Sequence, residues 1–337
     1  MPEELFKNIY RIPITLPGSP LKAVNSYFIC GAGRNLLIDT GFNHPDCKAA
    51  MLSALKVLGA DLNHTDILLT HLHSDHSGLA AGIAAPETRI FLPRAELPRM
   101  LWETRAPLWQ QDIERMVGFG FPRAIAEDEL TFSTSYAMAP DPAFSRYLPI
   151  DEGDEFICGD YRVTAVSTPG HTPGHMCFWL EEQQILFTGD CILFDITPNI
   201  TSWQEMEDAL GTYLASLRKL DSFDVRIALP AHRTPGEFHA RIKALLAHHE
   251  IRLEECWNVV KANPGASVYD LASKMTWKMH SNSWSDFPPF QKWFAVGECH
   301  SHLQRLEVLG RIQKEDGKPV RYSAAQTEHI SADKDVV

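Results

Sequence analysis

A dense run of potential metal ligands follows a short apolar stretch of this sequence. The segment THLHSDHSG places His71, His73, Asp75 and His76 within six residues. In an extended segment, residues two apart point the same way, so His71 and His73 can hold one ion while the turn through Ser74 directs the other two toward a second ion. A plain polar loop would instead have to satisfy three crowded imidazoles that repel one another when protonated. The run therefore predicts a metal site.

Three further segments place a histidine or an aspartate at the end of a predicted strand. STPGHTPGH contributes His171 and His175, FTGD contributes Asp190, and LPAH contributes His232. Two metal ions need about seven ligands if one carboxylate bridges them, and the chain supplies seven at strand ends. His171 directly follows its strand and is predicted to be the ligand. His175 lies further along the turn and is predicted to support the ligands structurally.

The elements that must position these residues follow an α/β order. Strand-like segments at 9–16, 24–31 and 35–41 precede a helical pattern at 44–59, and a short apolar strand then leads into the His-rich loop. In such folds, functional residues tend to lie on loops that follow strand ends. From about 94 to 147 the pattern becomes helical, which predicts an inserted helical arm.

The order of these motifs closely resembles that of the metallo-β-lactamase superfamily. The matching motifs are His-x-His-x-Asp-His at 71–76, Thr-Pro-Gly-His at 168–171, Thr-Gly-Asp at 188–190 and Pro-Ala-His at 230–232, with LLIDTG at 36–41 as a further match. The resemblance covers roughly residues 8 to 245 and is specific, because four ordered motifs coincide. It implies an α/β protein built as a four-layer αββα sandwich with a dinuclear metal site at one edge.

The resemblance also implies a ligand set and a mechanism. The first metal would be bound by His71, His73 and His171, the second by Asp75, His76 and His232, and Asp190 would bridge them. A hydroxide held between the two cations, its pKa lowered toward neutrality, would attack a substrate carbonyl or phosphorus, with Asp75 and His232 as the catalytic residues beside it. Asp39, in LLIDTG, is either a support of this site or a turn residue.

The predicted metal content is two Zn²⁺ ions per chain, because imidazole-rich ligation suits zinc, with Fe or Mn as alternatives. Flavodiiron relatives carry a carboxylate at the position of His73 and an added flavodoxin-like domain, so a diiron oxidoreductase is disfavoured. A persulfide dioxygenase with a single iron stays an alternative, although its relatives generally lack a C-terminal extension such as the one in this chain.

The C-terminal part resembles the winged helix attached to one branch of the superfamily, which contains the mitochondrial endoribonuclease and many bacterial hydrolases. We therefore expect a catalytic domain at 1–245, which includes the helical insert at about 94–147. A winged-helix-like domain would follow at 246–325, and a frayed tail would end the sequence at 326–337. Residues 246–325 carry ten basic and nine acidic side chains, far from the basic surface of a nucleic-acid binder.

The candidate recognition helix within this region has an apolar stripe formed by Trp293, Phe294, Leu303, Leu306 and Leu309. Such a stripe indicates a domain or subunit interface more often than a surface that enters a nucleic-acid groove. Two histidines on the same helix, at positions 300 and 302, are predicted to be plain surface or interface residues because alternating residues on a helix point apart.

Aromatic residues of the insert offer a clue to the substrate. An apolar pocket over the metals could be walled by aromatic side chains of the insert, together with Phe194 after the Thr-Gly-Asp motif: Trp102, Trp109, Phe119 and Phe121. Alternatively, the aromatic side chains of the insert, which include Phe119 and Phe121, bury against the core or a second subunit. Both hold if the insert itself builds the pocket.

The composition is that of an ordinary globular protein. The 337 residues include 31 basic and 43 acidic side chains, and the net charge of −12 argues against a nucleic-acid or membrane surface spread over the whole molecule. No apolar run approaches the roughly 20 residues that span a bilayer. The seven cysteines include no Cys-x-x-Cys pair and fit reduced thiols. We expect a soluble cytoplasmic protein.

These observations together predict a zinc-dependent dinuclear hydrolase acting on a thioester, ester or lactone with an apolar portion. Two alternatives stay open: a single-strand endoribonuclease, and a metal-bound scaffold without catalytic activity. The expected partner is a small-molecule substrate. We expect no membrane partner, and nucleic acid is disfavoured. A homo-oligomer formed through the insert or the winged helix is a further expectation.

Overall fold

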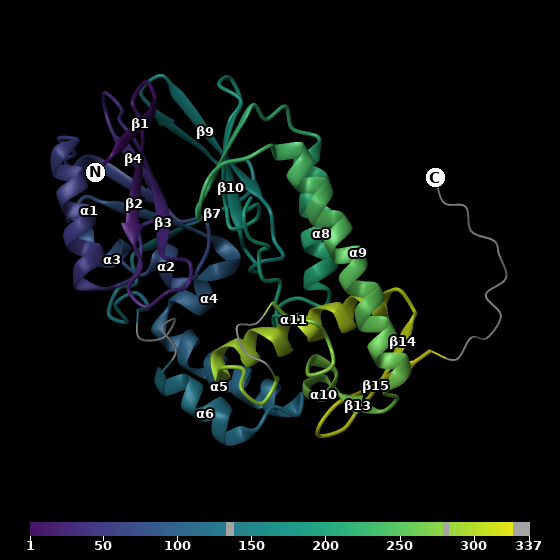
Figure 1. The fold of residues 1–337 in the computed structure, drawn as a ribbon. Coiled ribbons are helices and arrows are strands. Elements are labelled where there is room, and N and C mark those ends of the chain that lie inside the picture. Colours follow the sequence, from purple (N-terminus) through teal and green to yellow (C-terminus); the bar gives the residue numbers. More distant parts are fainter. Residues whose placement is uncertain (133–137, 279–282, 326–337) are drawn as a thin grey trace.

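The computed structural model describes residues 1–132, 138–278 and 283–325, so the predicted tail at 326–337 lies outside the described residues. The chain forms two large β-sheets, helices on their outer faces, and a C-terminal region with a small third sheet (Figure 1). Among the described helices, none is both long and apolar enough to cross a bilayer.

The first sheet contains seven strands that neighbour one another in sequence order: β1 (Glu3–Phe6), β2 (Ile9–Thr15), β3 (Ala23–Ile29), β4 (Asn35–Ile38), β5 (Thr65–Leu68), β6 (Arg89–Pro93) and β7 (Tyr147–Ile150). Strands β1 to β4 pair in antiparallel fashion, and β4 to β7 pair in parallel. Because parallel strands end at the same edge of a sheet, the residues after β4 and β5 meet there.

The second sheet has the order β12-β11-β10-β9-β8. Its strands are β8 (Glu155–Cys158), β9 (Tyr161–Ser167), β10 (Met176–Leu180), β11 (Ile185–Gly189) and β12 (Ile227–Pro230). Strands β11 and β12 are parallel, so Asp190 and His232, which follow them, lie at one edge. The turn that leads from β9 to β10 brings His171 to the same edge.

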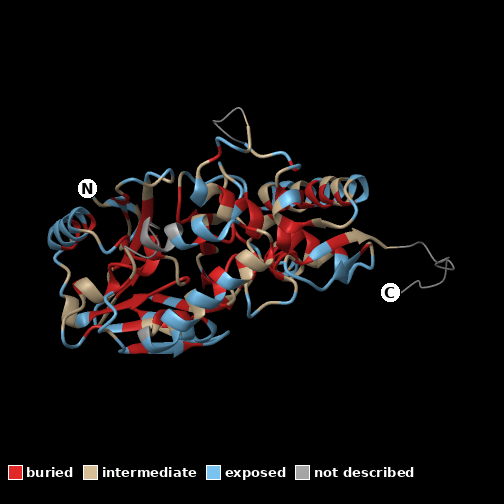
Figure 2. Ribbon diagram, turned by 90° about the horizontal axis from the view of Figure 1, so that it is seen from below, coloured by how far each residue is buried: buried red, intermediate tan, exposed pale blue. Residues whose placement is uncertain are grey.

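Apolar side chains fill three layers between these elements. One layer lies between the two sheets and includes Ile29, Phe178 and Phe187. The second joins the first sheet to the helices α1 (Pro45–Val57) and α3 (Ala80–Ile83), and the third joins the second sheet to α8 (Ala209–Asp221) and α9 (Phe238–Ala262). Figure 2 shows buried residues inside these layers and exposed residues on the outer helix faces. The predicted αββα sandwich is therefore confirmed.

Local sequence signals explain where the covering helices begin. Helix α1 begins with Pro45, whose missing N–H costs nothing in a first turn, and its N-cap His44 accepts a hydrogen bond from the Asp46 amide. The side chain of Asp208 caps α8 by accepting the Gly211 amide at 2.7 Å.

The segment predicted as an insert forms η2 (Arg94–Glu96), α4 (Leu97–Met100), α5 (Trp102–Gly118) and α6 (Arg123–Phe132). Its aromatic side chains pack against the C-terminal region. The Phe119 ring stacks on His300 with centroids 4.0 Å apart, and the Phe121 ring contacts Tyr269 and Trp293 edge-on. Of the two uses predicted for the aromatics, burial against other elements therefore describes Phe119 and Phe121.

The C-terminal region contains β13 (Ala266–Ser267), α10 (Val268–Ala272), α11 (Pro289–Val308), β14 (Ile312–Glu315) and β15 (Arg321–Ala324). The three strands form a sheet of order β13-β15-β14. The boundary predicted at residue 245 falls inside α9, a helix that runs without interruption from the sandwich into this region (Figure 1). The region's assignment as a winged helix stays a prediction.

Of the two uses predicted for the histidines at 300 and 302 of α11, surface or interface, burial excludes the surface, because the His300 ring stacks on Phe119 of the insert and the His302 ring lies against His249 of α9. His302 is fully inaccessible and His300 is 8% exposed. Helix α11 packs against helices of the sandwich, the insert and the C-terminal region, so several of its faces are covered and its amphipathic pattern is weak. The predicted apolar stripe is correspondingly incomplete, because Phe294 and Leu309 are exposed.

Candidate metal centre

The loops at one edge of the sandwich bring all seven predicted ligands together. Three overlapping groups of donor atoms each lie within 4.8 Å of one another: His71, His73 and His171; His71, His76 and Asp190; and Asp75, His76 and His232. Within the described part of the chain, His175 belongs to none of these groups. The geometry therefore separates the two histidines of STPGHTPGH in the way the sequence predicts.

The first group consists of three imidazole nitrogens around one point. His73 Nδ1 lies 2.9 Å from His71 Nε2 and 3.0 Å from His171 Nε2. Burial and the neighbouring imidazoles keep the pKa of His71 well below its usual value and lower the pKa of His73 to about 3. Neutral imidazoles with converging lone pairs are the donors that a divalent transition metal requires.

Two backbone carbonyls determine which nitrogens face the site. His171 Nδ1 donates to the Asn199 carbonyl and His232 Nδ1 donates to the Ala23 carbonyl, both at 2.8 Å. Because a carbonyl can only accept, Nδ1 carries the proton in each ring and Nε2 presents its lone pair to the site.

The group of Asp75, His76 and His232, together with Asp190, contains polar atoms that are buried without a hydrogen-bond partner among the described residues. These atoms are His76 Nε2, His232 Nε2 and Asp190 Oδ1. Asp75 Oδ2 lies 3.3 Å from His232 Nε2 and 3.8 Å from His76 Nε2. Orphaned buried polar atoms are costly, and nitrogen and oxygen donors aimed at a common point fit a divalent cation.

Asp190 links the two groups. Its Oδ2 lies 3.6 Å from both His171 Nε2 and His76 Nε2, and its Oδ1 lies 3.5 Å from His232 Nε2. Although burial lowers the pKa of His76, the surrounding carboxylates of Asp39, Asp190 and Asp75 raise it well above the usual value. This local excess of negative charge is what bound cations would balance.

Asp39 contacts the site from the end of β4. Its carboxylate accepts a hydrogen bond from His76 Nδ1 at 2.7 Å, and it also accepts the backbone amide and hydroxyl of Thr70. Its backbone has φ of 58°, the left-handed conformation of a turn. Asp39 is therefore a turn residue that also contacts His76, and its role in supporting a metal site stays a prediction.

His175 supports the Asp190 loop. Its Nε2 accepts the Asp190 backbone amide at 3.0 Å, and its Nδ1 lies 2.9 Å from the Thr168 hydroxyl. Gly189 lies against the same ring with φ of 50°, and a Cβ at that position would come within 2.6 Å of His175 Nε2. The glycine in Thr-Gly-Asp is therefore required by this close approach as well as by its backbone conformation.

Glu96 connects the two ligand loops, and sequence reasoning did not identify it. This fully buried carboxylate accepts the Leu72 amide at 2.9 Å and the Gly174 amide at 2.5 Å. Leu72 lies between His71 and His73, and Gly174 immediately precedes His175. A single glutamate at the start of the insert carries no spacing pattern that could have marked it.

Trp203 lies beside the first donor group and was also not predicted. Its Nε1 donates to the His171 carbonyl at 3.0 Å, and its ring centroid is 6.1 Å from that of His73. Of the predicted pocket residues, Trp109 and Phe194 are partly buried against the large core cluster that also contacts Trp203. The side chain of Trp102 lies outside the described side chains.

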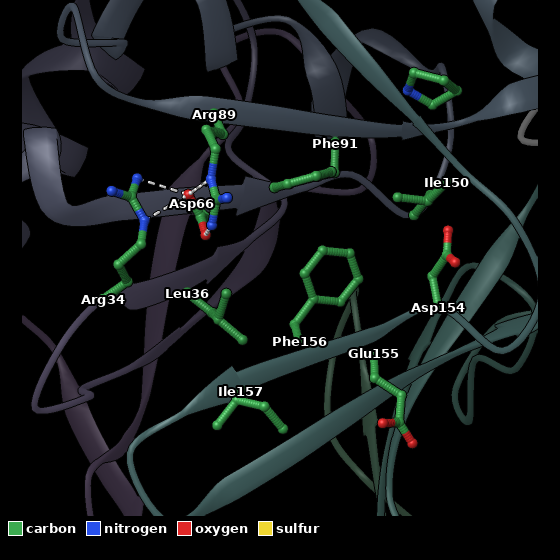
Figure 3. A pocket seen from close by; sticks show the side chains of 11 residues that line it. Arg34, Leu36, Asp66, Arg89, Phe91, Ile150, Asp154, Glu155, Phe156 and Ile157 are labelled. Carbon is green, nitrogen blue, oxygen red and sulfur yellow. Dashed lines mark hydrogen bonds and ion pairs between the residues drawn. The ribbon is translucent and has the colours of Figure 1, made fainter.

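A separate cavity of about 390 Å³ lies at the opposite ends of the parallel strands (Figure 3). Figure 3 shows Asp66 held between Arg34 and Arg89, with Phe91 and Phe156 on the apolar side. Asp66 Oδ1 accepts Arg34 Nη2 at 2.7 Å and Arg89 Nε at 2.8 Å. Because Arg34 precedes β4, Asp66 lies near the start of β5 and Arg89 begins β6, this ion-paired side of the cavity is distinct from the metal site, whose residues follow the strands.

The class of protein follows from this site together with the fold. The family profile of the Metallo-beta-lactamase superfamily matches residues 20–232. The chain belongs to this superfamily, and its grouped histidine and aspartate donors could hold metal ions.

Two curated relatives come from fungi. The Lactamase-like protein adaB of Aspergillus niger is 29% identical over 259 residues, which cover 75% of this chain and 64% of that protein. The Lactamase-like protein nscB of Arthroderma benhamiae is 31% identical over 255 residues, covering 73% of this chain and 44% of that protein. This chain therefore matches less than two thirds of the length of either relative.

Solved structures match almost the whole chain. A metallo-beta-lactamase family protein from Thermus thermophilus is 29% identical with a TM-score of 0.79, covering 95% of this chain and 100% of that chain. A beta-lactamase domain protein from Burkholderia ambifaria has a TM-score of 0.81 at 23% identity, over 96% of this chain and 94% of that chain. At this identity the match shows the fold alone. The similarity therefore extends into the C-terminal region.

Proposed function

We propose that this chain is a dinuclear metal-dependent hydrolase whose substrate is a thioester, ester or lactone with an apolar portion. The observation that carries the proposal is the set of donor groups joined by Asp190, in which Nε2 of His76 and Nε2 of His232 are buried without a hydrogen-bond partner among the described residues. The imidazole-rich donor set favours zinc as the bound metal. When bound, two such cations would lower the pKa of a bound water and polarise the scissile group.

Asp75 is the residue best placed to act on the attacking water. It is 9% exposed, and its carboxylate faces His232 and His76 rather than another part of the protein. We assign it the role of accepting a hydrogen bond from that water and orienting it toward the scissile carbon. The hydrogen bond from His232 Nδ1 to the Ala23 carbonyl fixes the His232 ring. Its Nε2 therefore stays in place while Asp75 orients the water.

The apolar part of the substrate is inferred from an aromatic side chain beside the site. The Trp203 ring centroid lies 6.1 Å from that of His73, and Trp109 and Phe194 are partly buried against the core cluster that also contacts Trp203. Curated relatives bear the description lactamase-like, which is in keeping with the hydrolysis of an acyl bond. These observations favour a substrate that combines an acyl group with an apolar body.

The C-terminal region offers little support for an RNA substrate. Of the cations on α11, Lys292 is buried and donates to the Ser285 carbonyl, and Arg305 pairs with Asp208 at 2.9 Å. Cations that are engaged inside the protein cannot bind phosphates without breaking these contacts. An acyl substrate is therefore favoured over single-stranded RNA.

The test compares the purified metal-loaded protein on a panel of acyl thioesters, esters and lactones and on single-stranded RNA. We expect two metal ions per chain by elemental analysis, turnover of acyl substrates, and loss of both turnover and metal in the variant His71→Ala. The matched control is His64→Ala, which removes an exposed histidine that pairs with Asp61.

Two results would overturn the proposal. Cleavage of RNA that depends on His71, without turnover of any acyl substrate, would identify the chain as an endoribonuclease. Two bound metals without any turnover of either class would identify it as a scaffold.

A further inference from the structure

A short segment of the chain separates the metal centre from helix α11. On its inner side, the Asn199 carbonyl accepts the proton of His171 Nδ1 at 2.8 Å, and Trp203 Nε1 donates to the His171 carbonyl at 3.0 Å. These two bonds determine both the orientation of the His171 ring and the position of its backbone. The placement of residues 199–203 therefore determines where His171 Nε2 points.

On its outer side, this segment is bound by one backbone carbonyl and one side chain of α11. The Ser202 amide donates to the Gly297 carbonyl at 3.1 Å, and the Ser301 hydroxyl donates to the Ile200 carbonyl at 2.5 Å. A Cβ at Gly297 would come within 2.0 Å of the Thr201 hydroxyl. The helix and the segment are therefore in such close contact that neither can move independently.

One side chain of α11 reaches the residue that holds His171. Glu298 Oε2 accepts the Asn199 side-chain amide at 2.8 Å, and Glu298 Oε1 lies 3.8 Å from Arg252 Nη2 of α9. The Glu298 side chain is 17% exposed and that of Arg252 is 9% exposed. This carboxylate is therefore held between two helices and directed at Asn199.

We propose that Glu298 is a positioning residue of the metal centre: through the Asn199 side chain it fixes the Asn199 carbonyl, which orients His171 as a ligand. This inference rests on the proposed function, because it assumes that His171 binds a metal. It also gives the C-terminal region a role in the chemistry without a nucleic-acid partner. Supporting residues of this kind typically contribute about 10- to 100-fold to metal affinity.

The test uses the full-length protein loaded with Co²⁺ in place of zinc. In Glu298→Ala, we expect Co²⁺ affinity, measured by competition with a chelator, to fall by about 10- to 100-fold. We also expect a changed visible absorption spectrum, and a lower kcat with little change in KM. Glu298→Gln keeps a carbonyl oxygen for the Asn199 amide and should recover most of the affinity and the original spectrum.

A matched control separates positioning from stability. Arg305 lies on the same helix and pairs with Asp208 at 2.9 Å, but it makes no contact with Asn199, Glu298 or Arg252 among the hydrogen bonds and ion pairs of the described residues. Arg305→Ala should lower the melting temperature and leave the Co²⁺ spectrum unchanged. A spectrum that changes as much in Arg305→Ala as in Glu298→Ala would overturn the proposal, because the effect would then follow stability alone.

A second variant keeps the test decisive if Glu298→Ala folds poorly. Asn199→Ala retains the carbonyl that binds His171 and removes only the link to Glu298, so it should produce the same loss of affinity, and the double variant should lose no more than either single variant. If Asn199→Ala keeps the affinity and the spectrum of the wild type, the inference about Glu298 is refuted. The proposed function would still stand in that case, because the wild-type enzyme would still hydrolyse its substrate. Failure of the wild type to bind two metals would instead refute the proposed function.

Discussion

Replacing Glu96 by alanine tests whether one buried carboxylate holds the two ligand loops together. The substitution leaves the Leu72 and Gly174 amides without their acceptor, and the complete burial of Glu96 keeps water from replacing it. A buried donor left unsatisfied costs about 1–3 kcal/mol, so two cost about 2–6 kcal/mol. Glu96→Gln retains one acceptor oxygen and should lose about half of that amount.

The assay is urea denaturation of the metal-loaded protein, with the unfolding free energy extrapolated to water. Glu182→Ala is the matched control, because Glu182 is exposed and its removal should change the unfolding free energy by no more than about 0.5 kcal/mol. If Glu96→Ala loses less than about 1 kcal/mol, the two amides are satisfied by some other group, and the assignment of Glu96 as the connection between the loops is refuted.

Three further predictions address the support of the site, the buried histidines and the packing of α11. Asp39→Ala removes the acceptor of a ligand imidazole and should weaken metal binding by about 10- to 100-fold in a chelator competition; unchanged affinity would contradict the role given to that aspartate. Burial lowers the pKa of His302 to about 4 from its usual 6.5, so the unfolded chain binds the extra proton. The unfolding free energy should therefore fall by about 3 kcal/mol as the pH drops through 6.5 toward 4, and His302→Gln should flatten this dependence in urea titrations. Gly297→Ala places a methyl group within 2.0 Å of a neighbouring hydroxyl and should destabilise the fold by about 1–3 kcal/mol in thermal melts. The matched variant Gly33→Ala meets nothing within 4 Å and should melt like the wild type.

The ligands could be predicted from the sequence because their positions depend on local geometry. His71 and His73 are two residues apart after a strand, and Asp190 and His232 lie one and two residues after strands that pair in parallel. In such a sheet, the strand end alone determines which edge a residue reaches. Histidine and aspartate at those positions therefore indicate a metal site before any distance is known.

The residues that support these ligands could not be predicted from the sequence in the same way. Glu96 and Trp203 are single residues of common types, and their contacts depend on how distant segments pack. Asn199 contributes a backbone carbonyl to His171, which any residue type could provide. Periodicity also failed for α11, because a helix covered on several faces has no single apolar side and its buried His302 looks like a surface residue.

The contact between α11 and the segment at 199–203 has a consequence for the order in which the protein matures. A ribosome has placed the last of the seven donor residues, His232, in the chain when Glu298 is still 66 residues away. At about 5–20 residues per second, that interval lasts roughly 3 to 13 s. During synthesis the ligands therefore exist for several seconds before α11 is available to brace His171. Full metal affinity is expected only after the C-terminal region has emerged and docked.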